Sequence, residues 1–276
     1  MSKGLLDPKV DFVFKNIFGS PNHPEILISF LNATLKAKKK IVNVDIKKTD
    51  IEKQYIEDKY SRLDVKATTS NDEIINIEIQ LKNENNMVKR SLYYLSKMYE
   101  EQLNEKEDYS KLVRTVCINI LNFKYLKTDN FHTGYRFKEI ESNEELTDIM
   151  EVHFIEIPKL QDSSDEKDML VAWTEFLKDP ESEKVRGLEL SIEEIRQAKD
   201  ELIRMSNDST QRELYDMRAN SLRDKMSELN AAERKGIEKG REEEKIKIAI
   251  NMKLNGLDTN TIAKVTNLSE DEIDKL

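Results

Sequence analysis

The chain has 276 residues, of which 38% are hydrophobic and 36% charged, and its formal net charge at pH 7 is −9. This length predicts one or two domains with ample room for a core, and the composition predicts a polar, helix-rich protein. We find no apolar run long enough to cross a membrane and no signal peptide. The single cysteine, Cys117, cannot form an internal disulfide, so we expect it to be buried and the protein to be cytoplasmic.

The charge is unevenly distributed along the chain. Residues 1–128 contain 22 Lys and Arg against 18 Asp and Glu, whereas residues 129–276 contain 23 against 36. The total charge argues against binding of polyanions over the whole surface, but phosphate contacts depend on local clusters of basic residues. The basic first half therefore permits DNA binding without demonstrating it.

Two helices and a strand are predicted at the start of the chain. Residues 9–19 and 24–36 place their apolar side chains at helical spacing. The lysine-rich segment 36–40 closes the second helix, where positive charge suits the helix dipole, and phosphate contact is the alternative role. A strand is expected over 41–51.

Residues 60–82 are predicted to form a β-hairpin, because two runs of alternating polar and apolar residues flank a turn. Alternation places the apolar side chains on one face, which would join the core, and the polar side chains on the other. A turn centred on Asn71 sets Asp64 directly across from Glu78. Cβ atoms of such cross-strand neighbours are roughly 5 Å apart, so the two carboxylates would repel each other.

Two interpretations of this acid pair remain open. A divalent cation held between Asp64 and Glu78 would offset the repulsion, since magnesium prefers hard oxygen ligands. Alternatively, the polar face is simply solvated, and Lys66 and Lys82 balance the acids.

The following segments continue the sheet. Residues 87–105 form an amphipathic helix by their spacing, and the near-continuous apolar run 113–123 predicts a central strand covered on both faces. Residues 131–140 and 148–158 predict two more strands. Their histidines form no recognisable zinc motif.

The last hundred residues are predicted to be helical. Residues 165–180 and 190–206 form two helices, the second opening with a capping box from Ser191 to Glu194. Residues 211–256 could be one long helix, although Gly236 and Gly240 cost about 1 kcal/mol each in a helix interior.

The final residues 257–273 resemble a helix-turn-helix. The second helix carries four acids, which phosphate would repel, so an interaction module is favoured over a helix that reads bases. The acids are Glu270, Asp271, Glu272 and Asp274.

Several of these segments resemble one known family. Asp64 followed by Glu78-Ile79-Gln80 resembles the active-site motif of the PD-(D/E)XK nuclease superfamily, in its branch of Rpn-type recombination-promoting nucleases and putative transposases. This branch commonly has Gln where most of the superfamily has Lys. The segments DPKVDFVFKNIFG (7–19), RSLYYLSKMYEEQL (90–103) and 235–273 are similar to the same branch.

The resemblance implies a restriction-endonuclease-like α/β fold. Its mixed sheet has an α-β-β-β-α-β core, flanked by helices and followed by a helical C-terminal extension. We expect a nuclease-like domain over 1–160, a helical region over 161–234, and a helical tail with a helix-turn-helix-like end over 235–276.

The resemblance also implies a metal site for Mg²⁺ or Mn²⁺. Asp64 and Glu78 would hold the ion, with the Ile79 carbonyl and Asp11 as further ligands; a surface ion pair between Asp11 and Lys15 is the alternative. The catalytic set would be Asp64, Glu78, Gln80 and Lys82, with Lys82 or Lys66 supplying the positive charge that Gln80 lacks. The candidate phosphate-binding residues are Lys15, Lys66, Arg90 and Tyr94.

The expected function is that of a magnesium-dependent DNA endonuclease that promotes recombination or transposition. The alternative is a catalytically inactive nuclease fold used as a binding or assembly module. The expected partners are DNA and, through the helical C-terminal region, further copies of the chain.

Overall fold

The structure is a computed structural model that describes residues 4–37, 39–47, 65–165 and 167–276. The chain divides into two compact units, Met1–Arg218 and Ala219–Leu276. Each unit is described by itself below.

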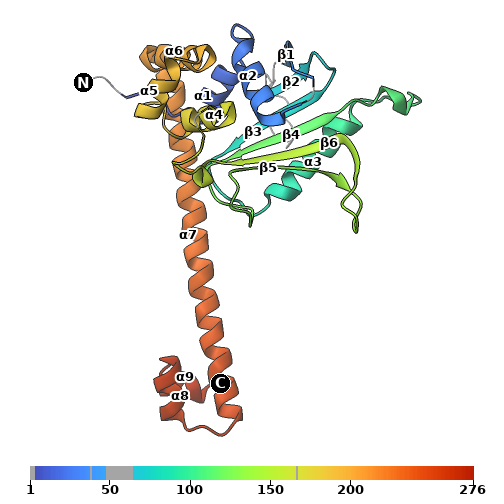
Figure 1. The fold of residues 1–276 in the computed structure, drawn as a ribbon. Helices are drawn as coiled ribbons and strands as arrows, with labels where there is room; N and C mark the ends of the chain where they lie inside the picture. The colour runs from blue at the N-terminus through green and yellow to red at the C-terminus, as the bar shows by residue number, and fades with distance from the viewer. Residues whose placement is uncertain (1–3, 38, 48–64, 166) are drawn as a thin grey trace. The chain divides into compact units, whose positions relative to one another are not determined.

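The first unit is built on a six-stranded sheet with the strand order β1-β2-β3-β4-β6-β5 (Figure 1). Strands β1 to β3 are antiparallel neighbours, β3, β4 and β6 run parallel, and β5 is antiparallel to β6. The predicted mixed sheet is confirmed. The strands are β1 (Val44–Lys47), β2 (Val65–Thr69), β3 (Ile74–Gln80), β4 (Thr115–Leu121), β5 (His132–Lys138) and β6 (Glu145–Glu156).

The register between β2 and β3 follows the alternation in the sequence. Val65 lies opposite Ile77, and Thr68 lies opposite Ile74. This is the register that a turn centred on Asn71 predicts. Asp64 lies outside the described residues, so its placement opposite Glu78 stays a prediction.

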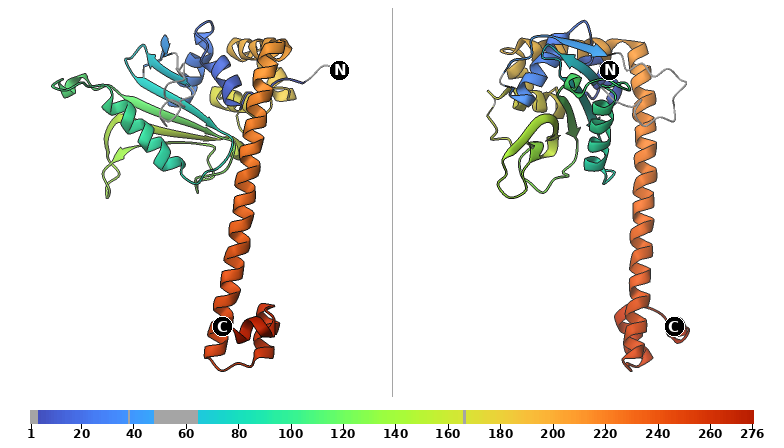
Figure 2. Two further views of the ribbon diagram at one scale, coloured as in Figure 1. Left: turned by 180° about the vertical axis from the view of Figure 1, so that it is seen from behind. Right: turned by 90° about the vertical axis from the view of Figure 1, so that its right-hand side faces the viewer.

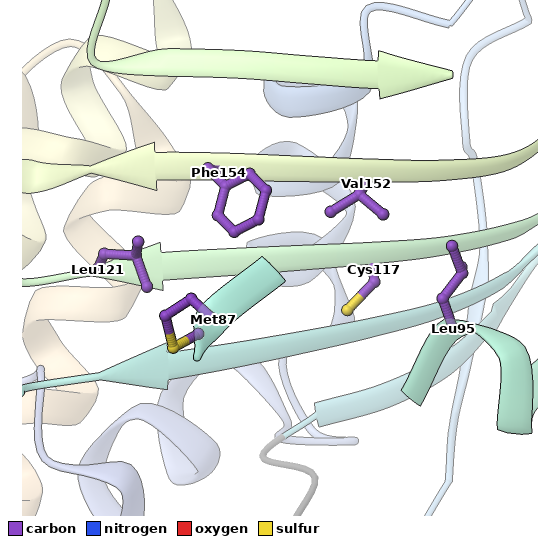
Figure 3. Close-up of a cluster of buried hydrophobic side chains, with 6 residues drawn as sticks. All are labelled: Met87, Leu95, Cys117, Leu121, Val152 and Phe154. Carbon is purple, nitrogen blue, oxygen red and sulfur yellow. The ribbon is translucent and has the colours of Figure 1, made fainter. Parts of the chain in front are cut away.

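One face of the sheet is covered by α3 (Met87–Glu100). Two side chains of α3 pack on apolar side chains of β4 and β6, as Figure 3 shows. Burial of this cluster fixes α3 against the central strands, because removal of apolar surface from water is the main favourable term in packing. Its members are Met87, Leu95, Cys117, Leu121, Val152 and Phe154.

The remaining helices of this unit form a second layer, away from α3 in the views of Figures 1 and 2. Phe18 of α1 contacts Phe30 of α2 and Trp173 of α4, all of them fully buried. A Cβ on Gly19, just past α1, would lie 3.3 Å from Val65, so α1 ends against β2. The helices are α1 (Asp11–Phe18), α2 (Pro24–Leu35), α4 (Met169–Lys178), α5 (Glu183–Glu189) and α6 (Glu193–Asn207), with 3-10 turns Tyr109–Lys111 and Ile157–Lys159.

The start of α6 differs from the sequence-based prediction. Helix α6 begins at Glu193 after Ile192, which makes no side-chain cap, so the predicted capping box from Ser191 to Glu194 is wrong. The Ser191 hydroxyl instead donates to the carbonyl of Leu188, at the end of α5. The Ser191 hydroxyl therefore does not cap α6, because it is bonded to the end of the preceding helix.

Helix α7 (Ser209–Leu254) is one continuous helix, which runs through Gly236 and Gly240. In the second unit its end packs on α8 (Thr259–Thr266) and α9 (Glu270–Asp274). A capping box between Ser269 and Glu272 opens α9. None of the helices in the described part of the chain has the length and apolar character that a membrane crossing requires. The apolar side chains shared by these helices are Ala249, Ile262, Leu268 and Ile273.

Candidate functional site

Glu78 lies on the polar side of β3, beneath α3. Its neighbour on the same face is Asn76, and the two side chains are 1% and 0% exposed. The interpretation of this face as a solvated surface is therefore wrong for both residues. Because α3 covers the face, each polar atom here has to find a partner within the protein or bind a ligand.

Arg90, in the first turn of α3, is the charged partner of Glu78. Its Nε lies 3.3 Å from Oε2 of Glu78, and its guanidinium stands over the ring of Tyr94, 5.4 Å from the centroid. A second carboxylate, that of Glu84, lies 4.0 Å from Arg90 Nη1. The structure thus brings together three of the sequence-predicted candidates, Glu78, Arg90 and Tyr94, and adds Glu84 from the loop before α3.

The carboxyl group of Glu78 is only partly satisfied. Burial raises the pKa of Glu78 to about 7, although the nearby Arg90 guanidinium lowers it. Among the described residues, its Oε1 atom has no hydrogen-bond partner. A buried carboxylate oxygen with an open coordination position fits a hard divalent cation, so the Glu78 half of the predicted metal site is compatible with magnesium or manganese. The Asp64 half lies outside the described residues.

The residues after Glu78 continue to the end of β3. Ile79 is buried, and Gln80, the last residue of the strand, is half-buried and accepts a hydrogen bond on its carbonyl from the backbone of Asn122. Lys82 lies two residues beyond the strand and is also half-buried.

Three further candidates, Asp11, Lys66 and Lys15, lie on α1 and β2. Asp11, the first residue of α1, forms an ion pair with Arg218 of α7 at 3.2 Å. Lys66 of β2 lies 3.9 Å from Glu101, and burial lowers the pKa of Lys66. Lys15 is half-buried on α1. Within the described ranges, no three His, Cys, Asp or Glu side chains form a metal-binding cluster.

Two buried polar features beside the site were missed by sequence reasoning, and the first is Asn119. This residue of β4 is paired with Glu78 in the parallel register, and its Oδ1 accepts a hydrogen bond from Ser91 of α3 at 2.9 Å. Its Nδ2 donates to the carbonyl of His153 on β6 at 3.1 Å. The signal was present, because Asn119 is an amide between Ile118 and Ile120 in the near-continuous apolar run 113–123.

The second feature is a buried polar network on the opposite face of the sheet. Nε2 of His132 lies 2.9 Å from Nδ1 of His153, and Nε2 of His153 lies 2.7 Å from Oε1 of Glu151. Although burial alone would raise it, hydrogen bonds from His153, Arg114 and Arg136 lower the pKa of Glu151 to about 2. Sequence reasoning treated these histidines as unrelated, because they are 21 residues apart.

The order of the elements and the position of Glu78 define the class of protein. An α-β-β-β-α-β core with a buried acid on its third strand is that of a restriction-endonuclease-like α/β protein. Residues 8–232 match the model of the PD-(D/E)XK nuclease family transposase, and residues 242–276 match the Rpn/YhgA-like nuclease family, C-terminal HTH domain. The chain therefore belongs to the PD-(D/E)XK nuclease transposase family, as its resemblance indicated, and this membership supports a nuclease-like role.

Neither the curated proteins nor the solved structures gave a match to the chain.

Proposed function

We propose that the chain is a metal-dependent endonuclease that hydrolyses phosphodiester bonds in DNA during recombination or transposition. The observation that carries this proposal is the state of Glu78, a buried carboxyl group with one oxygen that has no partner among the described residues and a pKa of about 7. Perturbed acids of this kind are concentrated at functional sites. Family membership supplies the reaction class that such an acid would serve.

In this proposal Asp64 and Glu78 hold Mg²⁺ or Mn²⁺, with the Ile79 carbonyl as a further ligand. Asp11, which pairs with Arg218, is not part of the proposed metal set. A bound divalent ion lowers the pKa of a coordinated water and neutralises charge on the scissile phosphate. Arg90 contacts Glu78 through Oε2, which leaves Oε1 for coordination. Deprotonation of Glu78 is the step that prepares the ligand, and it occurs near neutral pH.

The positive charge at the scissile phosphate has several candidate sources in this chain. Gln80 can orient a water molecule but carries no charge. Arg90 keeps its charge at every accessible pH and lies beside Glu78, so it is the best placed to contact a phosphate once Glu78 is engaged elsewhere. Lys82 follows the same strand and is the second candidate, whereas Lys66 is drawn toward Glu101. Tyr94 and Lys15 remain candidate phosphate contacts.

A nicking assay on duplex DNA with magnesium tests the proposal. The full chain, Asp64→Ala, Glu78→Gln and the control Glu193→Ala are compared at pH 8. Glu193 is an exposed acid at the start of α6, so its variant should cleave at the rate of the unmodified protein. The two site variants should lose at least about 100-fold, since each removes a ligand that supports transition-state charge. Equal cleavage by all four proteins would show that Asp64 and Glu78 do not form a catalytic site.

An inactive nuclease fold that serves as an assembly module is the second candidate function. It is favoured by the ion pair between Arg90 and Glu78, which gives the buried acid a partner without any metal. Calorimetric titration of magnesium distinguishes the two candidates. An assembly module should give no binding heat that depends on Asp64 or Glu78, whereas the nuclease should give heat that Glu78→Gln abolishes.

DNA is the proposed partner, and the helix-turn-helix family at the C-terminus gives it a second candidate contact. Helix α9 presents acids that phosphate would repel, so we assign the tail to assembly between copies of the chain. The side chain of Ile262 is 1% exposed in the core of the tail, and Ile262→Asp should disrupt these helices. DNA affinity should survive this change and self-association should not. A large loss of affinity with a reduced salt dependence would instead make the tail a DNA reader.

A further inference from the structure

The polar pocket around Glu78 is connected to α3 by one amide side chain. Asn119 is 0% exposed and lies beside Glu78 in the pairing of β4 with β3. Its two ends contact two different elements, since Oδ1 accepts from Ser91 of α3 and Nδ2 donates to the His153 carbonyl of β6. One side chain thereby ties the helix to two strands of the sheet.

The orientation of this amide is determined by its partners. The carbonyl of His153 can only accept a hydrogen bond, so the nitrogen of Asn119 has to face β6 and its oxygen has to face α3. The Ser91 hydroxyl has a single proton, which it shares between Asn119 Oδ1 at 2.9 Å and the Met87 carbonyl at 2.7 Å. All of these groups are buried, so no water can replace a lost contact at low cost.

The contact to Ser91 sets the position of the residue that precedes it in the chain. Arg90 precedes Ser91 on α3 and reaches Glu78 at 3.3 Å, where small rotations of the helix would change the distance. Tyr94, one turn further along α3, packs its ring against the guanidinium. A helix held at Ser91 therefore presents Arg90 to Glu78 in a single arrangement.

We propose that Asn119 is a positioning residue of this site, which acts through Ser91 and helix α3 to hold Arg90 against Glu78. The assignment rests on the proposed function for its catalytic consequence, but its physical consequence can be measured without substrate. Loss of the Asn119 contact lets the start of α3 open more often, and Arg90 then leaves Glu78 more often.

The experiment follows amide hydrogen exchange at the start of α3, residues 90–95, in the full, metal-free chain. Asn119→Leu and Ser91→Ala should each accelerate this exchange about threefold or more, because the buried contact that holds α3 to β4 is lost. Ser91→Thr keeps the hydroxyl and should exchange like the unmodified protein. Thr34→Val is the control, because it removes a buried hydroxyl bond within α2, remote from α3.

Cleavage of DNA provides the second readout. Loss of a supporting contact of this kind typically costs about 10- to 100-fold in activity, so Asn119→Leu and Ser91→Ala should lower kcat at pH 7 by about that factor with KM unchanged. Ser91→Thr should restore kcat.

Unchanged hydrogen exchange at the start of α3 in both Ser91→Ala and Asn119→Leu would overturn the assignment. If Asn119→Leu does not fold, the comparison of Ser91→Ala with Ser91→Thr decides alone. A chain without any nuclease activity would contradict the proposed function, and the exchange at α3 would still decide whether Asn119 holds this helix.

Discussion

A Cβ atom placed on Gly134 of β5 would lie 3.0 Å from Cε1 of His153 on β6. The ring of His153 cannot move away easily, because His132 holds its Nδ1 and Glu151 holds its Nε2. Absence of a side chain at residue 134 is therefore what allows the two histidines and the glutamate to form one buried network.

Replacement of Gly134 by alanine should destabilise the protein. Forcing a methyl group against a ring fixed at both ends costs about 1–3 kcal/mol in comparable cores. Urea denaturation of Gly134→Ala and of the control Gly187→Ala measures the difference. Gly187 lies in α5, where an added methyl group would meet no atom within 4 Å, so its variant should be stabilised by up to about 1 kcal/mol. Equal stability of Gly134→Ala and the unmodified chain would show that His153 can shift.

His132 should make the protein less stable in acid. Burial, and then electrostatic repulsion by His153 and Lys36, lower the pKa of His132 to about 4. Because the folded pKa lies below the unfolded value of about 6.5, the neutral form is favoured by folding, and this stability is lost as pH falls from about 6.5 toward 4. The loss amounts to about 2 kcal/mol, after allowance for the solvent that screens the part of the ring left exposed.

The variant His132→Gln tests this pH dependence. The free energy of unfolding of the unmodified chain, relative to that of His132→Gln, should fall between pH 6.5 and pH 4. His23→Gln is the control, since His23 pairs with Glu25 outside the buried network. A difference between His132→Gln and the unmodified chain that does not vary with pH would contradict the prediction.

Local periodicity predicted the strands and their register. The alternation in residues 60–82 was sufficient to place Val65 opposite Ile77, because a strand has a period of two and the turn fixes which residues face each other. The burial of Asn76 and Glu78 was not predictable in this way. It depends on the docking of α3, which begins at Met87, onto a face that looks solvent-exposed when the hairpin is considered alone.

Long-range polar contacts were the main omission. The pairing of Arg90 with Glu78 requires the helix to cross the strand at one position, whereas the sequence allowed Arg90 to face a phosphate instead. The contact between Asp11 and Arg218 joins residues that are 207 positions apart in the sequence, and no pattern in either segment predicts it. Such pairs are determined by packing, which a sequence pattern does not contain.

Glu78 should destabilise the metal-free protein at high pH. Its folded pKa of about 7 lies above the reference value of 4.5, so folding favours the protonated form. The associated stability is fully present below the unfolded pKa and is lost as pH rises through about 7, by up to about 3 kcal/mol. Glu78→Gln should therefore be more stable than the unmodified chain at pH 8, and the two should converge near pH 4.

Denaturation in chelator-treated buffer at several pH values measures this difference. Glu100→Gln removes an exposed carboxylate from α3 and should track the unmodified chain at every pH. Added magnesium should raise the unfolding temperature of the unmodified chain at pH 8 and leave that of Glu78→Gln unchanged, if the acid binds the ion as proposed. If the difference in the free energy of unfolding between Glu78→Gln and the unmodified chain did not vary with pH, the predicted pKa of Glu78 would be contradicted.

Two glycines in the second unit should limit the stability of α7 locally. Gly236 and Gly240 lie in this helix, and a methyl group added to either would meet no atom within 4 Å, so no packing requires them. Glycine costs about 1 kcal/mol relative to alanine in a helix interior, and Gly236→Ala with Gly240→Ala should slow amide hydrogen exchange over the surrounding turns about tenfold or more. The opposite change, Ala232→Gly, should accelerate exchange in the same turns. Unchanged exchange in the double variant would mean that this part of α7 opens only together with the whole unit.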